Sequence, residues 1–109
     1  MPESRLSPKV AAALRAAIGL AGGREVCFVC TEDADGVFQT GRVVSRGDVT
    51  SVLALPGFAQ RGEILVHNHP SGVLDPSDAD LAVAARLHDD GIGFAIIDNA
   101  ASRLYVVVE

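Results

Sequence analysis

Apolar residues recur along the chain with two different spacings, which predict two helices and several strands. In residues 8–21 the apolar side chains lie three and four positions apart, as on a helix with one buried face. This stripe consists of Val10, Leu14, Ala17 and Ile18. Ser7 is suited to the N-cap, Pro8 to the first helical position, and Gly22-Gly23 to the end of this helix.

Shorter apolar runs, bounded by turn-forming residues, predict the strands. The expected elements are helices at 8–21 and 78–90, strands at 25–32, 37–45, 63–67, 93–98 and 103–108, and a loop at 67–77. The pair Asp35-Gly36 predicts a hairpin between the first two strands. Pro56 and Gly57 interrupt residues 49–61, where we expect a short helix or two. We therefore expect one α/β domain over residues 1–109.

The N-terminal stretch has a second interpretation, because Arg5 and Lys9 precede an alanine-rich segment as in a secretory signal peptide. Arg15 interrupts that segment, and no apolar run in the chain reaches the length of a membrane span. We therefore interpret it as a folded amphipathic helix.

Composition and charge narrow the function classes. The chain has 109 residues, 49% of them hydrophobic, which fits one compact domain with a modest core. Its net charge is −5, and its nine basic residues are scattered. Because phosphate contacts need clustered Lys and Arg, we do not expect this domain alone to bind nucleic acid.

The two cysteines, Cys27 and Cys30, lie in a run that is typical of a strand buried on both faces. Residues three apart on a strand point to opposite sides, so these thiols are poorly placed for a disulfide or a shared metal. A zinc site of the C-x-x-C kind also needs a second pair, which the chain lacks. We expect two core thiols in a reduced, cytoplasmic protein.

Candidate metal ligands lie in the loop 67–77 and the helix after it. His67 and His69 are two apart after an apolar run, so on a strand both rings point to one face, about 6.5 to 7 Å apart. Asp80, in the first turn of the helix, shares a face with the apolar Ala84 and Leu87. A carboxylate that faces the core needs a partner or a metal. Two imidazoles, one carboxylate and a vacant position are typical of a catalytic zinc site.

A simpler interpretation exists for each part of this pattern. Ser77 and Asp80 fit a helix-capping box, S-x-x-D, that needs no metal. Two strand histidines can be ordinary surface residues. The conjunction of His-x-His, seven residues, Ser, two residues and Asp is a more complete pattern than either part. It resembles the signature of the JAB/MPN+ (JAMM) zinc metalloproteases, and the wording His69-Pro70-Ser71-Gly72 resembles their RadC-like bacterial branch.

This resemblance implies a fold and residue roles. The fold is an α/β/α sandwich around a central mixed, largely antiparallel sheet, similar to the cytidine deaminases. His67, His69 and Asp80 then hold Zn²⁺, and Ser77 donates a hydrogen bond to the oxyanion. A zinc hydrolase also needs a general base, and the family has a catalytic Glu at the start of the first core strand, where this chain has Glu25.

Other residues compete for these roles. Glu25 can instead be an exposed residue at the end of a strand. Glu63 precedes His67 by about 13 Å along the same strand, too far to share a water molecule, and Glu32 lies at the far end of its own strand. His88 lies roughly 12 Å beyond Asp80 on the helix, too far for a shared ion. The stretch Ile96-Ile97-Asp98-Asn99 falls where RadC-like members usually have Asp-His, and we assign Asn99 no role.

The resemblance implies hydrolysis of a peptide or isopeptide bond, at the tail of a ubiquitin-like or sulfur-carrier protein. The insertions with which larger members grip ubiquitin are missing around residues 49–61, which argues against ubiquitin itself. Two alternatives remain open: a non-catalytic protein-binding MPN module, and a RadC-like accessory domain of a DNA-repair or helicase protein. The second fits a domain fused within a larger bacterial protein.

Overall fold

The computed structural model describes residues 5–55 and 57–109. Its elements are α1 (Pro8–Leu20), β1 (Cys27–Glu32), β2 (Phe38–Ser45), α2 (Val49–Val52), β3 (Ile64–Asn68), α3 (Asp78–Asp89), β4 (Gly93–Ile97) and β5 (Leu104–Val108). These bounds differ from the expected ones by one or two residues at the ends. Two differences matter for the site: Glu25 lies just before β1, and Asn68 is the last residue of β3.

The five strands form one mixed sheet in the order β2-β1-β3-β4-β5. Strand β3 is parallel to β4, and the other three pairings, β1 with β2, β1 with β3 and β4 with β5, are antiparallel. A parallel pair needs a crossover between its strands, and α3 provides it. The expected α/β fold with a mixed, largely antiparallel sheet is confirmed.

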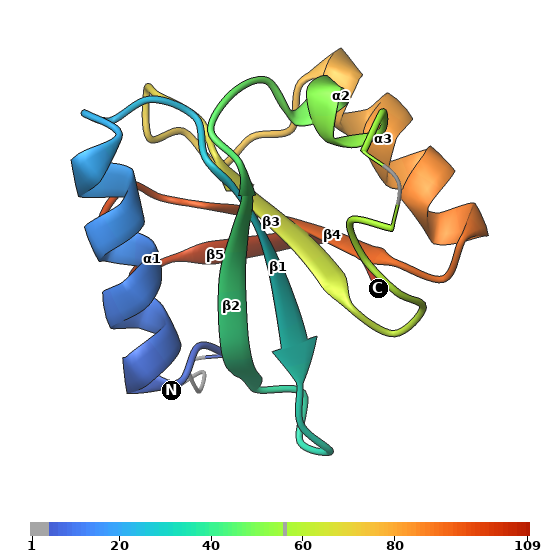
Figure 1. Ribbon diagram of the computed structural model, residues 1–109, viewed down its shortest axis with the longest axis horizontal. Helices are drawn as coiled ribbons and strands as arrows, with labels where there is room; N and C mark the ends of the chain where they lie inside the picture. Colours follow the sequence, from blue (N-terminus) through green and yellow to red (C-terminus); the bar gives the residue numbers. More distant parts are fainter. Residues whose placement is uncertain (1–4, 56) are drawn as a thin grey trace.

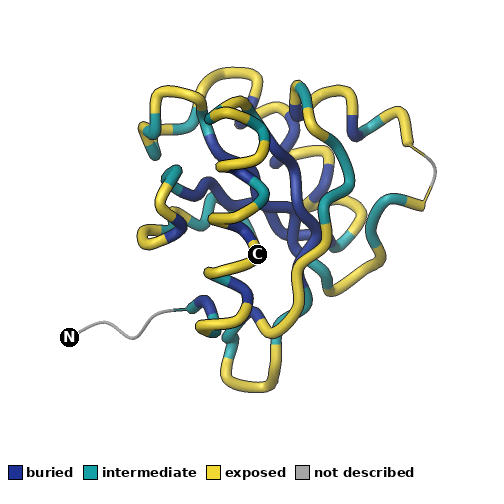
Figure 2. Tube along the Cα trace, turned by 60° about the vertical axis from the view of Figure 1, so that its left-hand side comes forward, coloured by how far each residue is buried: buried dark blue, intermediate teal, exposed yellow. Residues whose placement is uncertain are grey.

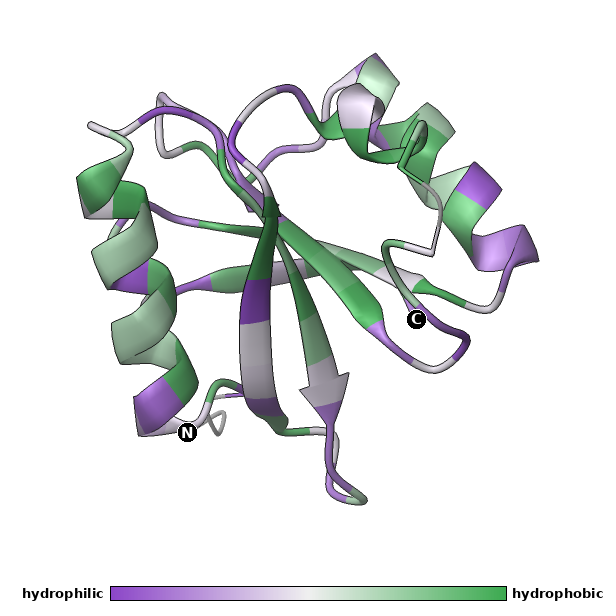
Figure 3. Cartoon of the chain, viewed as in Figure 1, coloured by the Kyte–Doolittle hydropathy of each residue, from purple (hydrophilic) through white to green (hydrophobic). Residues whose placement is uncertain are grey.

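Helices cover both faces of this sheet, with α1 on one side and α2 and α3 on the other (Figure 1). The buried residues accordingly form two clusters, one under α1 and one under α2 and α3. The trace is buried along the central strands and exposed mainly in the loops and on the outer sides of the helices (Figure 2). Hydropathy follows the same division, and β3 between the two layers is mostly hydrophobic (Figure 3).

The two cysteines confirm that β1 is buried on both faces. Cys27 belongs to the cluster under α2 and α3, and Cys30 belongs to the cluster under α1. Both thiols are free and fully buried, and burial raises the pKa of each to about 12. They are core residues, not nucleophiles.

Local residues fix the ends of the elements as expected. Ser7 caps α1 by accepting the N–H of Val10, and Pro8 occupies the start of the helix. Gly22 and Gly23, with φ of +69° and +80°, end it, because only glycine adopts this backbone readily. Within residues 5–55 and 57–109, no helix is both long and apolar enough to cross a membrane.

Candidate metal centre

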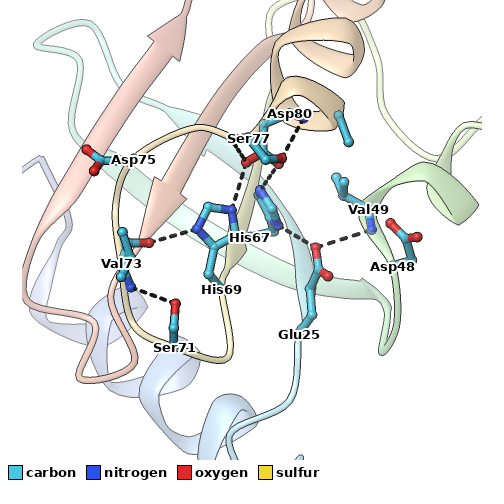
Figure 4. Close-up of a pocket in the computed structure, with 11 residues that line it drawn as sticks. Glu25, Asp48, Val49, His67, His69, Ser71, Val73, Asp75, Ser77 and Asp80 are labelled. Atoms are coloured by element: carbon cyan, nitrogen blue, oxygen red, sulfur yellow. Dashed lines mark hydrogen bonds and ion pairs between the residues drawn. The ribbon is translucent and has the colours of Figure 1, made fainter.

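The three expected ligands meet where β3 ends and α3 begins. Ring nitrogens of His67 and His69 and a carboxylate oxygen of Asp80 all lie within 4.8 Å of one another. The two histidines project from the end of β3 toward the first turn of α3, where Asp80 lies (Figure 4). His67 and Asp80 are each 1% exposed, so this is a buried polar cluster and not a surface pair.

Each imidazole has both nitrogens directed at oxygen atoms. Nδ1 of His69 lies 2.8 Å from the carbonyl oxygen of Val73, and Nε2 lies 2.7 Å from Oδ2 of Asp80. Nδ1 of His67 lies 2.6 Å from Oε2 of Glu25. Nε2 of His67 lies 2.9 Å from Oδ1 of Asp80, but the angles do not make a hydrogen bond, and this buried nitrogen has no hydrogen-bond partner within the described part of the chain.

Asp80 caps α3 and faces the histidines with the same carboxylate. Its Oδ2 accepts the N–H of Ser77 at 2.8 Å, while its own N–H donates to the Ser77 hydroxyl at 3.1 Å. Burial raises the pKa of the Asp80 carboxyl, but the N–H of Ser77, the two adjacent imidazoles and the Ser77 hydroxyl outweigh it, so the pKa lies below its ordinary value. The side chain is therefore an anion at neutral pH. The capping and metal-ligand interpretations of this residue are compatible.

The donor set fits a divalent cation. A carbonyl oxygen can only accept, so Nδ1 of His69 carries the proton, and an ionised Glu25 requires the same of His67. In two neutral rings both Nε2 atoms then present lone pairs to the Asp80 carboxylate, which also only accepts. A cation between them resolves this conflict, and the Nδ1 contacts are those by which metal-binding histidines are usually oriented.

Glu25 reaches the centre from the segment before β1. Cys27 pairs with His67 in the antiparallel register, which brings Glu25 to the same end of the sheet as the histidines. Oε2 of Glu25 accepts the N–H of Val49 at 3.2 Å as well as contacting His67. Its side chain is 21% exposed and lines the pocket. This carboxylate is therefore not a free strand-end residue.

An open pocket of about 360 Å³ surrounds the centre (Figure 4). It is lined by Glu25, Asp48, Val49, His67, His69, Ser71, Val73, Asp75, Ser77, Ala79 and Asp80. Four of these residues are acidic, and none is a lysine or an arginine. Ser77 is exposed to the pocket although it caps α3.

The competing residues lie elsewhere, as expected. Glu63 is paired with Arg42, and Glu32 is paired with Arg5. His88 is exposed in the last turn of α3. None of the three lines the pocket.

Sequence reasoning missed residues that support the centre. Asn68 is completely buried and donates a hydrogen bond to Asn99, for which the sequence alone indicates no role. A sequence signal for Asn68 exists, since an amide directly after a buried apolar run must find hydrogen-bond partners. Asp48 and Asp75 carried no such signal, because only the fold brings their loops to the pocket.

Comparison with known proteins points to one family. The protein-family model of the RadC-like JAB domain matches residues 59–98 of this chain. A UPF0758 protein of Vibrio atlanticus is 39% identical over 83 residues, which are 76% of this chain and 32% of that protein. One from Photobacterium profundum is 32% identical over 92 residues, 77% of this chain and 40% of that protein. One from Finegoldia magna is 53% identical over 38 residues. The chain thus spans less than half the length of these curated relatives.

Proposed function

The chain belongs to the RadC-like JAB domains, and from that premise we propose that it is a zinc-dependent peptidase or isopeptidase. His67, His69 and Asp80 hold the ion. One observation carries the proposal: both imidazoles commit Nδ1 to an oxygen acceptor and turn Nε2 toward an ionised, buried carboxylate. Three ligands beside an open pocket are typical of a catalytic zinc site, whereas structural sites are closed by four.

Bound there, Zn²⁺ supplies a Lewis acid that makes water nucleophilic near neutral pH. Glu25 is the proton carrier beside it. Its Oε2 is held by the N–H of Val49 and by His67, whereas Oε1 has no hydrogen bond within residues 5–55 and 57–109. In this proposal Oε1 takes a proton from the attacking water and hands it to the leaving amine.

Ser77 combines two roles in this scheme. Its hydroxyl oxygen accepts the N–H of Asp80, and the same hydroxyl can also donate one proton. Because Ser77 lines the pocket, that proton is available to the oxyanion that forms when the carbonyl is attacked.

We also propose a protein or peptide substrate, with a ubiquitin-like or sulfur-carrier tail as the class to test first. A pocket that opens on the surface suits an extended tail, and its acidic lining, with Asp48 and Asp75 at the exposed positions, does not suit a phosphate backbone. The free thiols fit action in the cytoplasm. We also propose that the domain acts within a larger bacterial protein, because its curated relatives are more than twice as long as the part that it matches.

The test uses metal-stripped protein, with and without one equivalent of Zn²⁺. Each sample is incubated with a panel of ubiquitin-like and sulfur-carrier proteins that carry a C-terminal peptide extension, and the products are identified by mass spectrometry. We expect cleavage only with zinc, and none by Asp80→Ala. Zinc uptake without cleavage of any fusion would favour a non-catalytic binding module, and absence of zinc uptake would overturn the metal assignment itself.

A further inference from the structure

Asn68 lies between the two histidines in sequence but on the other face of the sheet. Successive side chains of a strand alternate, so His67 faces α3 while Asn68 faces the α1 side. There it is 0% exposed among apolar residues. A buried amide in such surroundings is costly unless its hydrogen-bonding groups are satisfied.

The Asn68 carboxamide is satisfied almost entirely by the segment that carries Glu25. Its Oδ1 accepts the N–H of Val26 at 2.7 Å, and its Nδ2 donates to the carbonyl of Arg24 at 3.1 Å. The second proton of Nδ2 goes to Oδ1 of Asn99 at 2.9 Å. The residues before and after Glu25 are therefore both tied to one side chain of β3.

The direction of every bond in this network is fixed by the backbone. An N–H can only donate and a carbonyl can only accept, so Val26 and Arg24 determine which Asn68 atom is oxygen and which is nitrogen. Asn99 is fixed in turn at its other end, where its Nδ2 donates to the carbonyl of Pro70 at 3.1 Å. The chain of amides admits only one arrangement.

We propose that Asn68 is a positioning residue of the site. This inference rests on the function proposed above. Asn68 holds the backbone on both sides of Glu25, and thereby delivers the carboxylate to His67. Through Asn99 it also holds Pro70, in the loop whose next residues lead to Val73, the partner of His69. One amide pair thus joins the two segments that orient the metal-binding imidazoles.

The test follows the NMR resonance of the His67 Nδ1 proton in the metal-free protein. A short hydrogen bond to a carboxylate gives the Nδ1 proton a downfield, slowly exchanging resonance in NMR spectra of ¹⁵N-histidine-labelled protein, and Glu25→Gln identifies it by shifting it. We expect Asn68→Ala to broaden or lose this resonance. Val10→Ala, a truncation in the α1 core away from the site, should retain it even though it lowers stability.

Activity supplies the second readout. In the zinc-loaded protein we expect Asn68→Ala to lower kcat by about 10- to 100-fold, the range found for outer partners of metal ligands, with KM nearly unchanged. An unshifted, slowly exchanging His67 proton in folded Asn68→Ala would overturn the proposal, whether or not the domain hydrolyses anything. If that variant does not fold, Asn99→Ala decides: it keeps both bonds from Asn68 to the backbone beside Glu25 but releases the carbonyl of Pro70, so we expect faster exchange of the His69 Nδ1 proton. Wild-type exchange of the His69 proton in Asn99→Ala would equally overturn the proposal.

Discussion

The two ends of β3 each carry a carboxylate with a basic partner, and they differ in whether the protein completes the pair by itself. Before the strand, Glu63 takes two N–H groups of the Arg42 guanidinium, at 3.1 and 3.3 Å, and the N–H of Gln60 at 2.8 Å. A guanidinium is always charged and only donates, so every contact there joins a donor to an acceptor.

At the other end, two imidazoles meet two carboxylates and a carbonyl. Two neutral imidazoles carry one N–H proton each, so only two of these four nitrogen–oxygen contacts can hold a proton. No lysine or arginine lines the pocket. The Glu63 end is thus complete, whereas the histidine end has two carboxylates and no lysine or arginine to balance them. The difference between these ends indicates where an ion belongs, without any appeal to family resemblance.

The largest effect should come from removing a ligand at the incomplete end. His67→Ala should abolish tight zinc binding, because two remaining ligands cannot hold the ion as three do. Metal analysis after dialysis should find about one zinc per chain in the wild type and almost none in the variant. The gain in unfolding free energy with zinc, about 2.7 kcal/mol at 100 times Kd, should vanish as well.

The matched control is His88→Ala, which removes an exposed imidazole outside the centre. It should keep the full zinc complement. A full complement in His67→Ala instead would show that the ligand assignment is wrong.

The second largest effect should come from removing Glu25, the proposed proton carrier. Glu25→Gln should keep zinc, because the amide oxygen can still accept from Val49 and His67, but should lower the rate of hydrolysis by about 10²- to 10⁴-fold. Single-turnover cleavage with equal zinc loading measures this. Equal rates in variant and wild type would remove Glu25 from the chemistry.

Two substitutions of Ser77 distinguish its role in capping α3 from its proposed role in catalysis. Ser77→Ala should lower the unfolding free energy by about 0.5 to 2 kcal/mol, whereas Ser77→Gly should cost only a few tenths, because glycine is a tolerated N-cap. Both should lower the rate by about 10²-fold if the hydroxyl proton serves the oxyanion. Denaturant unfolding and turnover are measured together, and near wild-type turnover in the glycine variant would confine Ser77 to the helix.

The smallest effect should come from the Glu63 end of β3, where Arg42 already pairs with the carboxylate. Glu63→Gln should cost about 0.2 to 1 kcal/mol of stability, as partly exposed ion pairs do, with zinc binding unchanged. The hydrogen bond from Arg42 lowers the pKa of Glu63, so its contribution is present above the ordinary value of 4.5 and is lost as pH falls through the lowered folded value. Unfolding measured at pH 7 and near pH 3 should therefore show a larger difference at pH 7 than near pH 3. Lower zinc affinity in the variant would contradict the separation of the two ends.

The clustering of the three candidate ligands could be predicted from sequence because all of them are local. His67 and His69 are two residues apart at the end of β3, and Asp80 follows within one loop and one helical turn, so the local sequence relates them. The place of Glu25 depends on the pairing of β1 with β3, which no local pattern specifies, and resemblance supplied it. Asn68 and Asn99 were missed because their roles appear only when three separate segments meet.

The spacing of the ligands also bears on the unfolded chain. His67 and Asp80 bound a segment of fourteen residues, whereas Glu25 is 42 residues from His67. Closing a short loop costs little conformational entropy, so we expect the denatured ensemble to retain some affinity for zinc. Such binding offsets part of the stabilisation that the ion gives the native state. We therefore expect an ion present during refolding to bind His67, His69 and Asp80 before the pairing of β1 with β3 brings Glu25 to them.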